Sequence, residues 1–215
     1  MKIFNNSFGY DQLLRGTYGG ITYNVQAPLF EVFWDNNGSG INYRLLANHV
    51  LNAARSEDAV WVWAAGNLGW HTNGHVRFCL RSDTNCTNRI DNAIVGSVTP
   101  AEFKKGFTLD SSPSNPQVNL ANLPDSGTDF YAVLPAISGY ESLEERWLAV
   151  VAVQPDGDSY RLRDTGTNGC GRAMNWCLAA PGTNIFTTTS DGGHRAGNNG
   201  TSFAAPYVSG ALAVL

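Results

Sequence analysis

The chain has 215 residues, of which 43% are hydrophobic and 15% are charged. This composition supports the core of one globular domain and is too poor in charge for a coiled coil or a disordered chain. The formal net charge is −4 without any cluster of Lys or Arg, which argues against nucleic acid as a partner. No apolar run reaches the roughly 18 residues of a membrane span, and the first residues lack the apolar core of a signal peptide. We therefore expect any export signal to lie outside these residues.

The first predicted elements are a strand, a helix and a second strand. The segment "KIFNNSFG" (2–9) begins as a strand, and "YRLLANHVLNAARSED" (43–58) has the apolar spacing of a helix. The unbroken apolar run "AVWVWAAGN" (59–67) then predicts a buried parallel strand that ends in a tight turn. The predicted helical stripe contains a histidine, His49, which we interpret as a core or edge residue without a catalytic role. The other members of that stripe are Leu45, Leu46, Val50 and Ala53.

The second half of the chain continues the alternation after a long irregular segment. Residues 70–145 are rich in Ser, Asn, Pro and Gly, and we interpret them as a loop-rich insertion. The apolar run "WLAVVAV" (147–153) predicts a strand, "PDGD" (155–158) a turn and "WCLAAPG" (176–182) another strand. Strands that alternate with helices predict an α/β domain with a parallel sheet covered by helices.

The four cysteines form two close pairs, Cys79 with Cys86 and Cys170 with Cys177. Such local pairs predict two short-loop disulfides and an oxidising compartment, although four cysteines allow three pairings.

A zinc site is the alternative interpretation of the first pair. His71, His75 and Cys79 are four residues apart, so a helix would place them on one face. Asn73 and Gly74 disfavour a helix in this segment, so the prediction is a disulfide loop and no metal.

The C-terminal segment "GNNGTSFAAPYVSGALAVL" (197–215) can present one hydroxyl group. Gly200 allows a tight turn, and Ser202 then falls in the first turn of a predicted helix. Small residues after it allow that helix to pack closely against its neighbours. A nucleophilic serine needs a base, and the backbone N–H groups at a helix start can stabilise an oxyanion. The alternative is that Ser202 is only the N-cap of the helix.

Four motifs, in this order, resemble those of the subtilisin-like serine proteases. They are "NNSFG" (5–9), "WVWAAGN" (61–67), "WCLAAPGTNIFTT" (176–188) and "GTSFAAPYVSG" (200–210). The longer pattern from "LPAISGYESLEERWLAVVAV" to "CGRAMNWCLAAPG" is similar to the autotransporter passenger branch of Gram-negative bacteria. The resemblance implies a three-layer parallel-sheet fold and a secreted, extracellular or cell-surface serine endopeptidase. It implies no cofactor.

The resemblance also implies roles for individual residues. Ser202 matches the nucleophile, and Asn67 matches the side-chain donor of the oxyanion hole. One group matches the strand that binds an extended peptide or protein substrate. A second group matches a wall of the pocket for the residue before the cleaved bond. The first group is Ser7, Phe8 and Gly9, and the second is Ala64, Ala65 and Gly66.

The chain departs from the family pattern in its catalytic acid and base. In this family an Asp and a His precede the motif at 5–9, in the chain order Asp, His, Ser. None of the four histidines of this chain lies in such a position. The resemblance therefore implies a partial peptidase domain, 1–215, that lacks the segment carrying Asp and His and is inactive without it. The alternatives are a non-catalytic peptide-binding or antigen fragment and a pseudoenzyme. The four histidines are His49, His71, His75 and His194.

Overall fold

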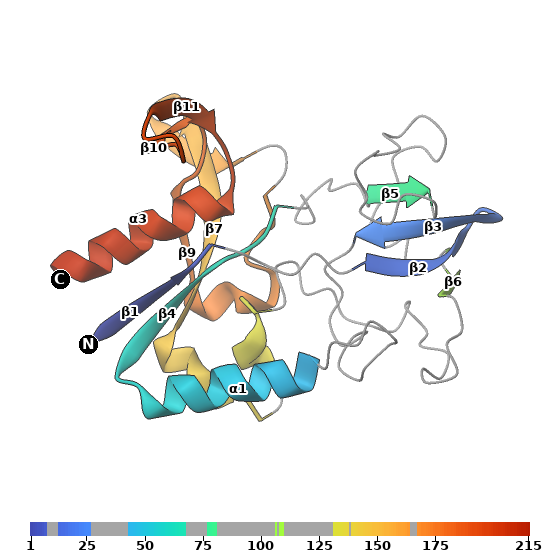
Figure 1. Cartoon of the computed structure of the whole chain (residues 1–215), viewed down its shortest axis with the longest axis horizontal. Helices are drawn as coiled ribbons and strands as arrows, with labels where there is room; N and C mark the ends of the chain where they lie inside the picture. The colour runs from blue at the N-terminus through green and yellow to red at the C-terminus, as the bar shows by residue number, and fades with distance from the viewer. Residues whose placement is uncertain are drawn as a thin grey trace.

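The structure is a computed structural model, and its largest sheet is mainly parallel (Figure 1). Four strands run parallel in the order β1, β4, β7 and β9, and β8 pairs antiparallel with the last part of β7. The structure describes residues 1–7, 13–26, 43–67, 77–80, 106, 108–109, 131–137, 139–163 and 167–215. The strands of this sheet are β1 (Lys2–Asn6), β4 (Ala59–Ala64), β7 (Trp147–Asp156), β8 (Ser159–Leu162) and β9 (Cys177–Pro181).

Elements cover both faces of this sheet, which gives three layers. Helix α1 (Tyr43–Ser56) and the 3-10 helices η2 (Leu134–Ala136), η3 (Glu141–Arg146) and η4 (Gly171–Trp176) contribute to one buried cluster. Helix α3 (Thr201–Val214) packs on the opposite face, as Figure 1 shows. Strands covered on both faces are expected to be apolar, as β4 and the first seven residues of β7, "WLAVVAV", are. The three-layer α/β prediction is confirmed.

A row of stacked aromatic rings fills part of the α1 side of the sheet. Phe4 on β1 stacks on Trp61 with ring centroids 4.6 Å apart, and Trp61 lies 6.0 Å from Trp147. Trp63 lies 5.2 Å from Trp147 and 4.9 Å from Tyr131. Trp63, Trp147 and Tyr131 are buried in this cluster, whereas Phe4 at the end of the row is 37% exposed.

The buried face of α1 differs from the predicted stripe. Ala47, Leu51 and Ala54 are buried, at i, i+4 and i+7, whereas His49 is exposed. Position 49 is two residues from position 47, so it lies on nearly the opposite side of the helix. Of the two positions predicted for His49, core or edge, the core position is therefore wrong.

A second sheet is antiparallel, in the order β5, β3, β2 and β6. Gly19 and Gly20 connect β2 and β3 with positive φ angles of 56° and 82°, as a tight two-residue hairpin requires. This "GG" pair is a hairpin signal that our sequence analysis missed. The strands of this sheet are β2 (Leu13–Tyr18), β3 (Ile21–Gln26), β5 (Arg77–Leu80) and β6 (Thr108–Leu109).

The segment that we interpreted as a loop-rich insertion, about 70–145, ends in the core of the parallel sheet. Leu134 and Leu143 are 0% and 1% exposed. The indole Nε1 of Trp147 donates a hydrogen bond to the carbonyl oxygen of Tyr131 (2.8 Å), which ties β7 to this part of the chain. The last residues of the segment are thus part of the packing that holds β7.

A short hairpin connects β9 to α3. Strands β10 (Ile185–Thr188) and β11 (His194–Asn198) pair antiparallel. The buried Asn198 donates from Nδ2 to the carbonyl oxygens of Ile185 (3.2 Å) and Arg195 (3.1 Å). One side chain therefore links both strands immediately before the start of α3.

Candidate active site

Ser202 lies in the first turn of α3, as predicted. The helix begins at Thr201 and its N-cap is Gly200, so Ser202 is the second helical residue. This overturns the alternative that Ser202 serves as the N-cap. The side chain is half-buried, and its hydroxyl makes no hydrogen bond to any residue that the structure describes.

Gly200 occupies a backbone conformation that a side chain would not tolerate. Its φ is +137°, and an added Cβ would lie 2.9 Å from Asn67 Oδ1. Its N–H donates to the carbonyl oxygen of Gly182 (2.8 Å), just after β9. The turn before Ser202 is therefore in close contact with both the end of β4 and the end of β9.

Asn67 joins the end of β4 to the start of α3. Its Oδ1 accepts hydrogen bonds from Thr201 N (2.9 Å) and Thr201 Oγ1 (3.2 Å). The Thr201 hydroxyl also accepts from Gly66 N (3.1 Å) and is fully buried. Because Oδ1 is bonded to the residue before Ser202, the Nδ2 end of the same amide is directed away from Thr201. Asn67 is thereby held against Thr201, the residue before Ser202, although the two are 134 positions apart in the sequence.

Asn168 contacts the turn after β4, in addition to the contacts that Thr201 makes with this turn. Ala64 and Ala65 are buried, and Gly66 has a positive φ of 96°. Asn168 donates from its backbone N–H to Gly66 O (2.9 Å) and from Nδ2 to Ala65 O (2.9 Å). The sequence analysis missed Asn168, because nothing in its local sequence points to a segment one hundred residues earlier.

Ser7 lies level with the predicted pocket wall. Strands β1 and β4 are parallel and pair Asn6 with Trp63, which places Ser7 beside Ala64. The Ser7 hydroxyl accepts from Asn5 Nδ2 (2.8 Å), and Asn5 Oδ1 accepts from Ser209 Oγ (3.0 Å) on α3. Phe8 and Gly9, the rest of the predicted substrate strand, lie outside the described residues.

The histidines are not grouped around Ser202 in the described part of the chain. His49 is exposed on α1. His194 is exposed on β11 and stacks on Phe186 with centroids 5.4 Å apart. His71 and His75 lie outside the described residues.

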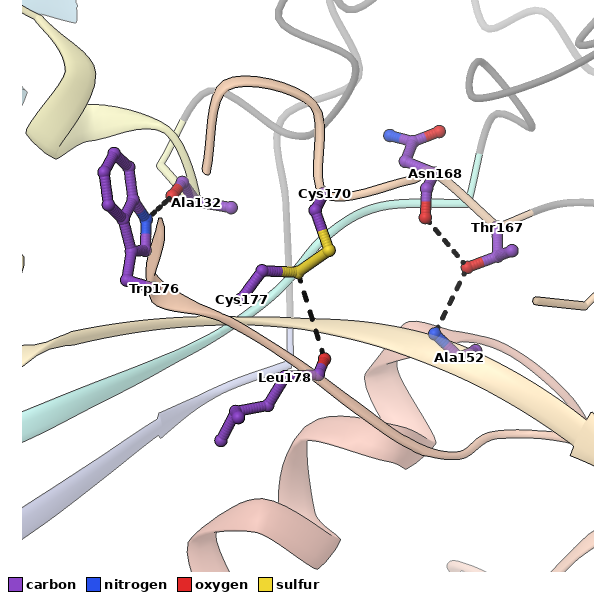
Figure 2. Close-up of a disulfide and its surroundings, with 8 residues drawn as sticks. All are labelled: Ala132, Ala152, Thr167, Asn168, Cys170, Trp176, Cys177 and Leu178. Carbon is purple, nitrogen blue, oxygen red and sulfur yellow. Dashed lines mark hydrogen bonds between the residues drawn. A yellow bond between two sulfur atoms is a disulfide. The ribbon is translucent and has the colours of Figure 1, made fainter. Parts of the chain in front are cut away.

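One of the two predicted disulfides is confirmed. Cys170 and Cys177 are bonded, with an S–S distance of 2.09 Å and Cα atoms 5.8 Å apart (Figure 2). Cys79 lies on strand β5 rather than on a helix, and its predicted partner Cys86 is outside the described residues. No group of three metal-binding side chains occurs among the residues that could be searched.

No helix in the described ranges is long and apolar enough to cross a membrane.

The described elements form a three-layer α/β domain with a parallel sheet, and Ser202 lies in the first turn of the helix that packs on one face of that sheet. The profile of the subtilase family, Peptidase_S8, matches residues 1–215. The chain therefore belongs to the subtilase family of serine peptidases.

Three solved structures are among those to which the chain is similar. The structure of the subtilase cytotoxin SubAB has 19% sequence identity and a TM-score of 0.47. The match covers 98% of this chain and 43% of the SubAB chain. The A-subunit of the AB5 toxin from E. coli has 20% identity and a TM-score of 0.45. The match covers 81% of this chain and 41% of the toxin chain. The patellamide maturation protease PatA has 21% identity and a TM-score of 0.45. The match covers 99% of this chain and 43% of the PatA chain. The present chain thus spans less than half the length of these proteins. No curated protein sequence matches it.

Proposed function

We propose that the chain carries the nucleophile and the oxyanion hole of a serine endopeptidase. The observation that carries this proposal is the contact of Asn67 Oδ1 with Thr201, which holds an amide donor beside Ser202. The Ser202 oxygen attacks the peptide carbonyl carbon and its proton passes to a histidine base. The carbonyl oxygen becomes an oxyanion bound by Asn67 Nδ2 and the Ser202 N–H. The amine leaves with that proton, and water then hydrolyses the acyl-enzyme.

The substrate of this proposal is an extended peptide segment of a protein. The strand end at Ser7, together with Phe8 and Gly9 that follow it in the sequence, would pair with the peptide backbone. Ala64, Ala65 and Gly66 would form a wall of the pocket, where small side chains leave room for the substrate. The half-buried position of Ser7 level with Ala64 supports this arrangement.

The base of this mechanism is proposed to come from a further segment of the same domain. In this proposal residues 1–215 are a partial peptidase domain, with an insertion at about 70–145, and the Asp and His lie in an upstream segment. Support comes from the Ser202 hydroxyl, which has no hydrogen-bond partner among the residues with described placement. Without that segment the chain would retain peptide binding and lose turnover.

The test is fluorophosphonate labelling of Ser202, with peptide cleavage measured in parallel. The chain alone should give neither, because its serine lacks a base. Addition of a subtilase segment carrying Asp and His, fused or as a separate fragment, should give both. Ser202→Ala should abolish both signals, whereas Ser190→Ala, in the exposed turn between β10 and β11, should leave them unchanged. Rapid turnover by residues 1–215 alone would contradict the partial-domain proposal and place the base within this chain.

We also propose that the protein is exported, to the cell surface or the medium, as a member of the autotransporter passenger branch. The Cys170–Cys177 disulfide supports an oxidising compartment. The test is digestion of intact producing cells with an added protease. Loss of the chain, with a cytoplasmic marker preserved, is expected, and full protection of the chain in intact cells together with its absence from the medium would contradict export.

A further inference from the structure

Asn168 contacts the two carbonyl groups that immediately precede Asn67. Its Nδ2 donates to Ala65 O and its backbone N–H donates to Gly66 O, each at 2.9 Å. The residue is only 1% exposed, so water does not compete for these hydrogen bonds. The two bonds fix consecutive peptide groups, and these set the direction in which Asn67 leaves the strand.

Asn168 is itself fixed to the sheet on both sides. The neighbouring Thr167, fully buried, accepts a hydrogen bond at Oγ1 from Ala152 N (3.4 Å) on β7 (Figure 2). Two residues after Asn168, Cys170 is bonded to Cys177, the first residue of β9. The position of Asn168 therefore follows from β7, which lies inside the sheet, and from β9, which pairs with β7.

Trp176 closes the loop between the two cysteines. Its Nε1 donates to the carbonyl oxygen of Ala132 (2.9 Å), and the side chain is buried. The 3-10 helix η4 that contains Trp176 is thus held at the core while the disulfide holds its ends together (Figure 2). A buried aromatic anchor and a covalent link leave the segment around Asn168 little freedom to shift.

We propose that Asn168 is a positioning residue, which acts through Ala65 and Gly66 to hold the Asn67 amide in the direction needed for the oxyanion. The catalytic consequence rests on the proposed function. An oxyanion donor must be placed within a fraction of an ångström, because a misplacement of about 1 Å can cost about 10²-fold in rate. Asparagine suits this role because its side chain supplies a neutral donor beside the backbone donor.

The first experiment measures the contact itself, in residues 1–215 without any catalytic partner. NMR hydrogen exchange of the Thr201 amide, which donates to Asn67 Oδ1, reports whether Asn67 is in place. Asn168→Asp replaces the side-chain donor with a carboxylate facing the carbonyl of Ala65. We expect Thr201 to exchange at least about tenfold faster, while the Ala136 amide, bonded to Val133 O in η2, stays protected.

The matched control is Asn175→Asp, which introduces the same charge at an exposed position of η4. It should leave the exchange of Thr201 unchanged. If Asn168→Asp does not fold, Asn168→Ala removes only the side-chain donor, and a smaller acceleration at Thr201 is expected. Unchanged exchange at Thr201 in a folded Asn168 variant would overturn the proposal.

The second experiment separates positioning from general destabilisation in the complemented enzyme. Asn168→Ala should lower kcat by about 10-fold to 10²-fold with little change in KM. In the Asn67→Ala background the same change should lower kcat by less than about twofold, because its effect passes through Asn67. Equal losses in the two backgrounds would show a merely structural role and refute the proposal.

The two experiments distinguish this proposal from the proposed function. If Asn67→Ala leaves kcat unchanged, Asn67 is not an oxyanion donor and the proposed function fails. The exchange of the Thr201 amide would still decide whether Asn168 positions Asn67, since that measurement needs no catalysis.

Discussion

At the scale of single residues, Gly200 determines how closely the turn before Ser202 approaches the end of β4. Its φ of +137° and the 2.9 Å separation between an added Cβ and Asn67 Oδ1 leave no room for a side chain. We expect Gly200→Ala to lower the free energy of unfolding by about 2 kcal/mol, from backbone strain and displacement of Asn67. Urea denaturation measures this loss.

The matched control is Gly210→Ala, on the same helix. An added Cβ at Gly210 meets no atom within 4 Å. Alanine should therefore stabilise the helix, by up to about 1 kcal/mol. Equal effects of the two substitutions would contradict the close-contact explanation.

Asp191, in the turn between β10 and β11, gives a pH-dependent contact. Hydrogen bonds from the Thr189 hydroxyl and then from the Gly193 N–H hold the pKa of this carboxyl below its usual value. Its contribution to stability is therefore present above the unfolded pKa, near 4, and is lost as the pH falls through the lower folded pKa. We expect the Gly193 amide resonance to titrate in that acidic window.

The substitution Asp191→Asn should remove this titration. The control Asp158→Asn, in the exposed turn between β7 and β8, should preserve it. A Gly193 resonance that titrates equally in the Asp191→Asn variant would assign the effect to another group.

The residues that sequence patterns could identify are those in contiguous motifs. Ser202 and Asn67 each lie in a run of residues with a recognisable order, and the structure brings them together. Asn168 could not be found in this way, since its role depends on contacts with a turn about one hundred residues earlier. Hydrogen bonds between distant segments leave no local pattern to read.

At the scale of elements, the disulfide and η4 form one unit. The bond closes a short loop from Cys170 to Cys177. We expect the double variant Cys170→Ser, Cys177→Ser to lose about 2 to 3 kcal/mol of unfolding free energy, because the unfolded chain regains the entropy that the short loop removes. Urea denaturation of the oxidised, reduced and double-variant proteins measures this.

Reduction of the unmodified chain serves as the internal control for that change. The reduced unmodified protein and the reduced double variant should have the same urea midpoint, below that of the oxidised unmodified protein. A double variant as stable as the oxidised protein would show that the packing of Trp176 alone holds η4.

Helix α1 shows where an amphipathic pattern is ambiguous. Ala47, Leu51 and Ala54 form its buried face, while Val50 of the predicted stripe is partly buried and His49 is exposed. Alanine is only weakly hydrophobic and occurs on both faces of helices, so it does not show which face is buried. The predicted stripe is therefore placed mainly by the larger side chains. The existence and extent of the helix could be predicted, but its rotation depends on the tight contacts of its alanines.

Two substitutions on α1 test the observed orientation. Leu51→Ala removes a side chain that is 6% exposed and should cost about 2 to 3 kcal/mol of unfolding free energy. His49→Ala, on the exposed side, should change it by less than about 0.5 kcal/mol. Thermal or urea unfolding distinguishes them, and a larger loss for His49→Ala would support the predicted stripe.

At the scale of the whole molecule, strand β7 belongs to both buried clusters. Trp147 and Ala149 pack on the α1 side, and Val150 and Ala152 pack on the α3 side. Because one strand serves both faces, we expect the two layers to unfold together. Near-ultraviolet circular dichroism of the aromatic row and far-ultraviolet circular dichroism of the helices should give coincident urea transitions.

Val150→Ala should move both transitions to lower urea by the same amount, although Val150 faces only α3. The control is an exposed residue of β8, Tyr160→Ala, which should move neither by much. Separate midpoints for the two signals would show that the layers on either side of β7 unfold independently.

The long separation between Asn67 and Thr201 has a consequence for when reactivity arises during folding. A contact between residues 134 positions apart has an entropic cost, because the chain between them must close into a loop. That cost becomes smaller once β7 and β9, which lie between them in the sequence, have joined the sheet. In the function proposed above, a nascent or misfolded chain therefore contains Ser202 without the Asn67 amide beside its helix turn. The proposed oxyanion geometry then arises only once the sheet and α3 have come together.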